Sequence, residues 1–404
     1  MLPVSAYGSP ASVDGVLREV VETLAELDRT PCSPGEREAA EWLAARLRSI
    51  PGTEVALEQE PSWGTFPPTA TGLGLLGMAG AALVLGGRRA AGALLAAASF
   101  AGVVDEAQNG PRILRRLVRR RRTTVNVIAR VGEGSETLVL LAHHDAPQTG
   151  ILFDQTLQRR LYELAPKLLE GRKTSPPQWW IGLAGPLLTI ASALGARRGG
   201  ARAGLLIGAL GTAFVADVWR NQTVAGANDN LSGVAALVAL AELLRERPLE
   251  NLRVLLISCG AEETLQDGVR ALIARHRDEL PVDATCFVNL DTVGSPHLVM
   301  LEGEGPVWME EYAGGWLRDR LAACAERLEI PLERGFRARA STDSVIPSRA
   351  GFPIATLVSI TDWRSPANYH LPSDVPENLD YDTVGDATRL VYELARTLAE
   401  DRQR

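Results

Sequence analysis

The stretch Thr137-Leu138-Val139-Leu140-Leu141-Ala142-His143-His144-Asp145 passes from an apolar run directly into three polar residues. The run through Ala142 predicts a buried strand that ends at His143. Side chains at the carboxyl end of such a strand line a cleft at the edge of an α/β sheet. We therefore expect His143 in that cleft and His144 on the opposite face, where it is not a ligand. Asp145 is placed to accept the second N–H of the His143 imidazole and so fix its tautomer.

The rest of the chain alternates strand and helix patterns. Helical spacing of apolar residues predicts two helices within residues 13–49, separated by a turn, and a third over Leu231–Arg245. Further strands are predicted at Thr53–Glu58, Val125–Ala129, Leu252–Ser258 and Cys286–Leu290. Strands that alternate with helices indicate an α/β fold whose sheet is covered on both faces.

Four further polar motifs follow His143 along the chain. They are Gly226-Ala227-Asn228-Asp229-Asn230, Glu262-Glu263, Asn289-Leu290-Asp291 and Tyr369-His370. Each has an ordinary explanation when taken alone, since Asp229 could cap a helix and two adjacent glutamates could be solvated loop acids. Asn230 or Ser232 could serve as that cap instead, which would leave Asp229 free. It is the ordered set that points to a shared site.

The residue types in these motifs are zinc ligands. A site with two zinc ions needs one imidazole for each metal, a shared carboxylate, terminal carboxylates and a free carboxylate that acts as a base. The chain can supply each of these parts. A metal beside Glu262-Glu263 would stabilise one carboxylate as a ligand and leave the other as the base.

The five motifs together resemble those of the M28 family of zinc peptidases, a group of aminopeptidases with glutamate carboxypeptidase and glutaminyl cyclase relatives. The resemblance implies one three-layer α/β/α domain over residues 1–404 around a mixed sheet. It implies His143, Asp229 and Asp291 on one zinc ion, and Asp229, Glu263 and His370 on the other, with Asp229 bridging. Glu262 would be the general base in the hydrolysis of a peptide or small amide.

Two departures from the family pattern concern the surroundings of the ligands. The stretch Ser341-Thr342-Asp343-Ser344 lacks the histidine that family members commonly have there, and Glu262-Glu263-Thr264-Leu265 lacks the glycine that usually follows the glutamate pair. Two other functions stay open. One is a single-zinc acyltransferase like glutaminyl cyclase, against which the retention of both His143 and Asp291 argues. The other is a non-catalytic scaffold, which would have no physical need for Glu262.

The bulk composition limits the partners. A net charge of −7 over 404 residues does not favour a nucleic acid partner. The first residues, Met1 to Gly8, lack a basic segment followed by an apolar run, which does not predict a cleaved signal peptide.

Two hydrophobic hairpins, 69–104 and 179–219, interrupt the α/β pattern. Each consists of two uncharged segments joined by a basic tip: Thr69–Gly87 and Ala90–Val104 in the first, Trp179–Ala196 and Ala203–Ala216 in the second. The first segment of each hairpin reaches the length of a membrane span and the second is shorter. Gly204 and Gly208 form a small-xxx-small pair that suits close helix packing.

The hairpins favour insertion into membrane lipid, because the catalytic motifs lie outside them and leave no core for them to fill. Buried hairpins in a soluble protein and a homodimer interface are the alternatives. Arginines crowd the catalytic-domain side of the first hairpin: Arg112, Arg115, Arg116 and Arg119 to Arg122. The positive-inside rule therefore predicts a cell-membrane protein with a cytoplasmic catalytic domain. The arginines could also bind anionic lipid headgroups.

Overall fold

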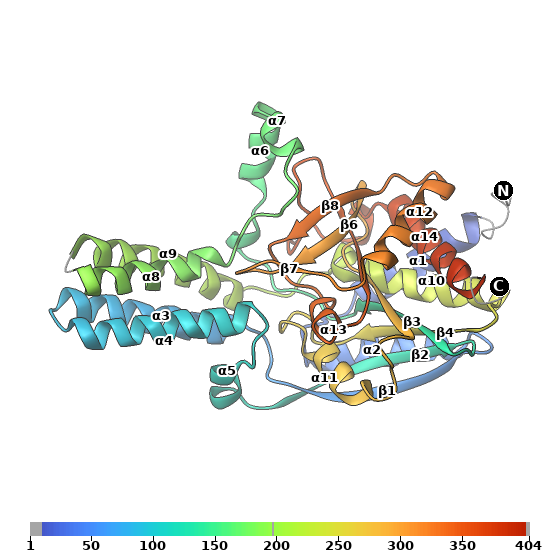
Figure 1. Ribbon diagram of the computed structural model, residues 1–404, viewed down its shortest axis with the longest axis horizontal. Helices are drawn as coiled ribbons and strands as arrows, with labels where there is room; N and C mark the ends of the chain where they lie inside the picture. Colours follow the sequence, from blue (N-terminus) through green and yellow to red (C-terminus); the bar gives the residue numbers. More distant parts are fainter. Residues whose placement is uncertain (1–9, 196–197, 401–404) are drawn as a thin grey trace.

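A nine-stranded mixed sheet forms the centre of the molecule (Figure 1). The computed structural model describes residues 10–195 and 198–400. The strand order is β1-β2-β4-β3-β5-β9-β6-β7, with β8 paired to β6. The strands are β1 (Glu54–Ser62), β2 (Arg122–Val131), β3 (Glu136–His143), β4 (Leu252–Cys259), β5 (Thr285–Leu290), β6 (His297–Glu304), β7 (Glu310–Glu311), β8 (Glu333–Ala338) and β9 (Ile354–Ile360).

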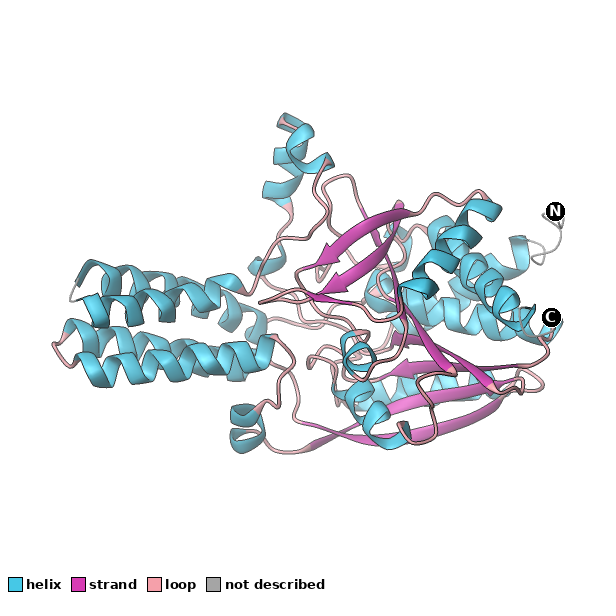
Figure 2. Cartoon of the chain, in the orientation of Figure 1, coloured by secondary structure: helices cyan, strands magenta, loops and turns pink. Residues whose placement is uncertain are grey.

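Helices cover both faces of this sheet (Figure 2). Alternate residues of β3 face opposite sides: Leu138 and Leu140 join one buried cluster, and Val139 and Leu141 join another. The first cluster contains residues of α1 (Pro10–Ala25), α2 (Pro34–Arg48), α10 (Ser232–Glu246), α12 (Gly315–Leu328) and α14 (Tyr381–Glu400). The second contains residues of α11 (Asp267–His276) and α13 (Val345–Arg349). The three-layer α/β/α fold expected from the sequence is confirmed.

The parallel core of the sheet brings three strand ends together. β3 lies between β4 and β5 and is parallel to both. The carboxyl ends of parallel strands share one edge of a sheet, where ligand sites of α/β folds form. His143, Cys259 and Leu290 are the last residues of these three strands, so the segments that follow them begin side by side.

A bundle of four helices projects from this edge of the sheet domain (Figure 1). It consists of α3 (Pro67–Leu85), α4 (Arg89–Ala107), α8 (Trp180–Gly195) and α9 (Arg198–Arg220), with α3 packed against the other three. The helices approach closely at glycines, because a Cβ on Gly185 would lie 3.0 Å from the Gly204 carbonyl oxygen and from Gly208 Cα. The predicted small-residue packing at Gly204 and Gly208 is confirmed.

The helix lengths differ from those expected from the uncharged runs. Within the described residues, Pro67–Leu85, Arg89–Ala107 and Gly199–Arg220 are long and apolar enough to cross a membrane, whereas Trp180–Gly195 is shorter. The expectation that the second segment of each hairpin is short was therefore wrong. α4 and α9 include charged end residues that bounded those runs. The tip residues Ala196 and Arg197, and the N-terminal residues 1–8, lie outside the described residues.

Each hairpin leaves and re-enters the sheet domain at one pair of neighbouring residues. Ser62 and Arg122, which flank the first hairpin, are directly paired across β1 and β2. Gln148 and Thr223, which flank the second, form an isolated antiparallel bridge. The second excursion also contains the short helices α6 (Thr156–Leu164) and α7 (Lys167–Glu170), which the sequence did not lead us to expect. The register of the sheet therefore does not depend on either insertion.

Buried charges fasten the bundle to the domain. α5 (Ile113–Val118) follows α4, and its Arg115 pairs with Glu106 of α4 while also donating to the carbonyl of Thr264. Arg112 pairs with Asp267, the first residue of α11, at 2.5 Å. Because Arg112 and Arg115 are buried, they do not contact lipid headgroups, and that part of the expectation for the arginine run was wrong.

We expect Arg115→Met to lower the free energy of unfolding by about 3–5 kcal/mol, because it leaves the buried Glu106 carboxylate without its partner. Chemical denaturation in detergent measures the change. Arg120→Met is the matched control, since Arg120 lies in the same arginine run but is exposed. The double variant Arg115→Met/Glu106→Leu should recover part of the loss. An effect no larger than that of Arg120→Met would contradict the assignment.

Candidate metal centre

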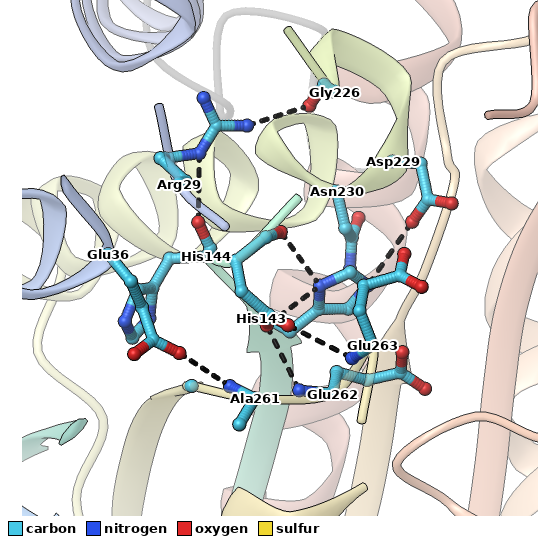
Figure 3. Close-up of polar contacts among 12 residues, drawn as sticks. Arg29, Glu36, His143, His144, Gly226, Asp229, Asn230, Ala261, Glu262 and Glu263 are labelled. Atoms are coloured by element: carbon cyan, nitrogen blue, oxygen red, sulfur yellow. Dashed lines mark hydrogen bonds and ion pairs between the residues drawn. The ribbon is translucent and has the colours of Figure 1, made fainter. Parts of the chain in front are cut away.

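Six polar side chains converge at the edge where β3, β4 and β5 end, and Figure 3 shows four of them, His143, Asp229, Glu262 and Glu263. His143 is the last residue of β3, the pair Glu262 and Glu263 follows β4, and Asp291 follows β5. Asp229 lies in the loop before α10, and His370 lies in the loop after β9. The structure thus brings together every residue for which the sequence predicted a metal-binding or base role.

The carboxylate of Asp229 lies between two imidazoles. Its Oδ1 is 3.2 Å from His143 Nε2, and its Oδ2 is 3.2 Å from His370 Nε2. His370 Nε2 is also 3.6 Å from Glu263 Oε1. Ligand atoms of His143, Asp229 and Asp291 lie within 4.8 Å of one another, and so do those of Asp229, Glu263 and His370. A third set, His143, Glu262 and Glu263, meets the same limit.

The electrostatics of this cluster suit a bound cation. Burial raises the pKa of Glu262 and of Glu263 well above the ordinary value, and burial raises that of Asp291 to about 7. Burial also acts to raise the pKa of Asp229, but the imidazoles of His143 and His370 lower it further than burial raises it. Buried carboxylates at this density repel one another unless protons or cations lie among them. Imidazole and carboxylate donors are the set that zinc accepts, so these residues fit that metal.

Asp145 joins the histidine to the glutamate pair. Its backbone oxygen lies 3.3 Å and its Oδ1 3.4 Å from His143 Nδ1. The same carboxylate accepts the backbone N–H groups of Glu262 at 3.0 Å and of Glu263 at 2.9 Å. The position is compatible with the predicted role of fixing the tautomer. The contact with the Glu262-Glu263 backbone could not be inferred from the spacing of the motifs.

His144 belongs to the core and not to the cluster. Its Nδ1 lies 2.9 Å from Ser258 Oγ, and burial lowers its pKa to about 4, which keeps the imidazole neutral. Alternation along β3 turns its side chain away from that of His143.

The loop that carries Asp229 is held by residues on both sides. Asn230 Oδ1 accepts the N–H of Gly233 in the first turn of α10 at 3.1 Å, so Asn230 caps that turn and leaves Asp229 free. The carboxylate of Asp374 accepts the N–H of Asn228 at 2.7 Å and that of Asp229 at 3.1 Å. Asp374 stands in the stretch that follows His370, and no role was predicted for it.

Arg29 is a further organising residue that the sequence did not reveal. The buried guanidinium donates to the carbonyl of His144 at 2.8 Å and to that of Gly226 at 3.3 Å (Figure 3). It also donates to the carbonyl of Ala225 at 2.7 Å. It therefore ties the end of β3 to the turn that precedes Asp229. No pattern around Arg29 marks it, because the carbonyls that it joins at the site belong to residues more than a hundred positions away.

The carboxylate of Glu262 is oriented by a neighbouring amide. Gln266 Nε2 donates to Glu262 Oε1 at 2.6 Å and to the carbonyl of Ser341 at 3.1 Å. Ser341 begins the stretch in which the family histidine is absent. Here that stretch contributes a backbone carbonyl near the cluster, together with the buried carboxylate of Asp343, whose pKa burial raises to about 8.

Comparison with known proteins supports the resemblance for part of the chain. Residues 210–395 match the sequence family described as peptidase family M28. This part of the chain is therefore similar to peptidase family M28. The matched part contains Asp229, the glutamate pair, Asp291 and His370, and it supports a zinc-dependent hydrolase. No curated protein matches the chain.

Solved structures of similar fold include two kinds of enzyme. An aminopeptidase from Aneurinibacillus sp. strain AM-1 is 14% identical, with a TM-score of 0.53 over 94% of this chain and 92% of that one. A leucine aminopeptidase precursor from Bacteroides thetaiotaomicron is 15% identical, with a TM-score of 0.54 over 95% and 96%. Glutaminyl cyclase from Bacteroides thetaiotaomicron is 14% identical, with a TM-score of 0.53 over 95% and 97%. At these identities the likeness shows a shared fold.

We expect Asp145→Asn to weaken zinc binding about 10- to 100-fold, because an amide cannot replace both oxygens that hold His143 and the glutamate pair. Titration of the protein against a zinc chelator measures the affinity. Asp362→Asn is the control, since Asp362 is an exposed acid that pairs with His297. Equal zinc affinities for the two variants would remove Asp145 from this role.

Proposed function

We propose that this chain is a membrane-anchored dizinc metallopeptidase of the aminopeptidase type, which hydrolyses a peptide or small amide bond. In this proposal His143, Asp229 and Asp291 hold one zinc ion, and Asp229, Glu263 and His370 hold the other. The observation that carries it is the Asp229 carboxylate, each of whose oxygens faces a different imidazole. A carboxylate in that position is suited to bridge two ions.

When bound, two such ions would polarise the substrate carbonyl and make a water at the site more acidic. Glu262 takes a proton from that water and later gives it to the leaving nitrogen. The C–N bond of the amide breaks, the water oxygen forms the new C–O bond, and the products are a carboxylate and an amine. Gln266 keeps Glu262 pointed at the reacting water through its 2.6 Å hydrogen bond.

The outer surface of the helical bundle supports membrane anchoring. Leu94, Leu194 and Leu206 are exposed by 71%, 82% and 71% although they lie on the most apolar helices of the chain. In water such side chains would form a large apolar surface, which lipid removes. The two hairpins, 69–104 and 179–219, would then be insertions into one peptidase domain of residues 1–404.

Aromatic residues mark the level at which the bundle meets the domain. Phe66 precedes α3, Trp179 precedes α8, Trp180 begins α8, and Trp219 stands near the end of α9. The exposed fractions of Trp180 and Trp219 are both 48%. Tryptophan and other aromatic side chains prefer the boundary between lipid and water. Their place at the domain end of the helices supports a membrane surface there.

Charge supports a cytoplasmic catalytic domain. Arg116 and Arg119 to Arg122 remain on the domain side of the first hairpin after the buried Arg112 and Arg115 are set aside. The tips of the two hairpins carry Arg88, Arg89, Arg197, Arg198 and Arg202, and Arg220 at the end of α9 adds to the domain side. The larger positive charge favours the domain side as the cytoplasmic one.

We expect Glu262→Gln to lower the rate of hydrolysis by about 100- to 10,000-fold while zinc stays bound, because the amide cannot accept a proton. Zinc content of the detergent-purified protein and cleavage of a panel of aminoacyl anilides are measured together. Asp229→Asn is the contrasting variant, which should lose both ions.

The zinc content of the unaltered protein decides between the functions. Two ions and chelator-sensitive cleavage are the results expected of a dizinc peptidase. One ion without cleavage would overturn that assignment in favour of glutaminyl-cyclase-type chemistry, and the absence of zinc would leave a scaffold. Activity of Glu262→Gln near that of the unaltered protein would exclude Glu262 as the base.

We expect a cysteine placed at Arg88 to react with a membrane-impermeant maleimide from the outer side of intact cells. One placed at Arg120, on the domain side, should react only after the cells are opened. The expectation follows from the excess of arginine beside the domain. The unaltered chain, which has its own cysteines, gives the background of the labelling. The reverse pattern would place the catalytic domain outside, and equal labelling of both would contradict spanning helices.

A further inference from the structure

An apolar cavity runs from the metal centre into the helical bundle. Its volume is about 110 Å³, counted as the space open to the centre of a water molecule. Glu262, Glu263 and His370 line one end of it. The remainder lies among the four helices, where α9 lines it from Gly204 to Val215. At a rise of 1.5 Å per residue, that stretch of helix is about 16 Å long.

Glycines keep the cavity open. A Cβ on Gly208 of α9 would meet only Met78 Cγ, at 3.5 Å, and a Cβ on Gly182 of α8 would meet only Val103 Cγ1, at 3.5 Å. Both contacts are ordinary van der Waals distances, so a Cβ would fit at either position, and both glycines line the cavity. An empty apolar cavity costs stability, and water does not fill it readily. A helical bundle that retains such a space has room for an apolar ligand.

The cavity has charge only at its mouth. Among the described residues of the bundle, those that line it are uncharged, and Glu262, Glu263 and His370 supply the ionisable groups at its open end. A second, wider pocket begins at the same point and leads away from the bundle. Glu262 and Tyr369 line both pockets, and the second adds polar side chains such as Gln158, Thr292 and Thr342. The metal centre therefore stands where an apolar channel and a more polar pocket meet.

We infer that the bundle cavity binds a single aliphatic chain of the substrate, so that the enzyme hydrolyses amides of long-chain amphiphiles. The aliphatic chain of the substrate would lie among α3, α8 and α9. The scissile amide would lie beside Glu262, and the polar part of the substrate would lie in the second pocket. This inference rests on the proposed hydrolase and adds the class of substrate to it. The aliphatic chain of the substrate is attached on one side of the amide, either as the acyl group on the carbonyl or as an alkyl group on the nitrogen.

Two series of substrates test the inference. N-acylglycines with acetyl, octanoyl, lauroyl and palmitoyl groups place the chain on the carbonyl, and glycine alkylamides of matching lengths place it on the nitrogen. We expect kcat/KM in one series to rise by about fourfold for each methylene that the cavity buries, and then to level off. The series that shows the rise identifies the side on which the chain stands. Equal kcat/KM for all lengths in both series would overturn the inference.

Filling the cavity is the structural test. Gly208→Leu should move the optimum to shorter chains and lower kcat/KM for the lauroyl substrate while the acetyl substrate is cleaved as before. Gly72→Leu is the matched control, because Gly72 lies on α3 with nothing within 4 Å of an added Cβ and outside the cavity. Gly182→Leu fills the same cavity from another helix and serves if Gly208→Leu does not fold. Identical chain-length profiles for the filling variants and Gly72→Leu would overturn the inference.

A binding measurement separates this inference from the catalytic proposal. N-lauroylglycine is titrated calorimetrically into detergent-purified Glu262→Gln protein, with and without Gly208→Leu. Binding at least tenfold tighter than that of N-acetylglycine, and lost with Gly208→Leu, supports the chain site even if no amide is hydrolysed. If the unaltered protein cleaves short amides but N-lauroylglycine and N-acetylglycine bind equally well, the proposed hydrolase activity would be supported. The proposed binding site for an aliphatic chain would then be excluded.

Discussion

Mutual repulsion among buried carboxylates at one edge of the sheet is the constraint on which the rest of this structure depends. Asp229, Glu262 and Asp291 arrive there from three separate segments, and burial alone would drive each of them to take up a proton. The fold offsets this cost by fixing the backbone around the acids. Arg29 and Asp374 hold the loop of Asp229, and Asp145 holds the glutamate pair. Two imidazoles and the space between the acids complete an environment suited to divalent cations.

The sequence predicted those features whose physical signal is local. An apolar run that ends in His143 is enough to place a strand and its last side chain, and parallel neighbours then place Asp291 and the glutamate pair at the same edge. The resemblance to a family supplied the pairing of His143 with Asp229 and of His370 with Glu263, and the structure brings these atoms together.

What the sequence did not reveal lies in contacts between distant backbone groups. Arg29 binds carbonyls that follow β3 and precede α10, and nothing in its own neighbourhood indicates this. Arg112 and Arg115 were predicted to lie on the surface together with the neighbouring arginines. The sequence of a run of like charges does not indicate which of its members are buried. Helix ends in the bundle were misjudged for a related reason, since a terminal arginine ends an uncharged run without ending the helix. The apolar cavity had no sequence signal beyond an abundance of glycine, which close helix packing explains equally well.

The roots of the two hairpins have a consequence for how such a molecule can arise. Ser62 and Arg122 are paired neighbours in the sheet, and so are Gln148 and Thr223 across their bridge. A short turn could therefore join either pair, and the sheet would keep its register in the absence of the bundle. The bundle is in this sense an addition to the sheet domain that begins and ends at neighbouring positions. The buried Arg115 joins the two parts, since it pairs with Glu106 of α4 and donates to the carbonyl of Thr264, in the loop that follows the glutamate pair.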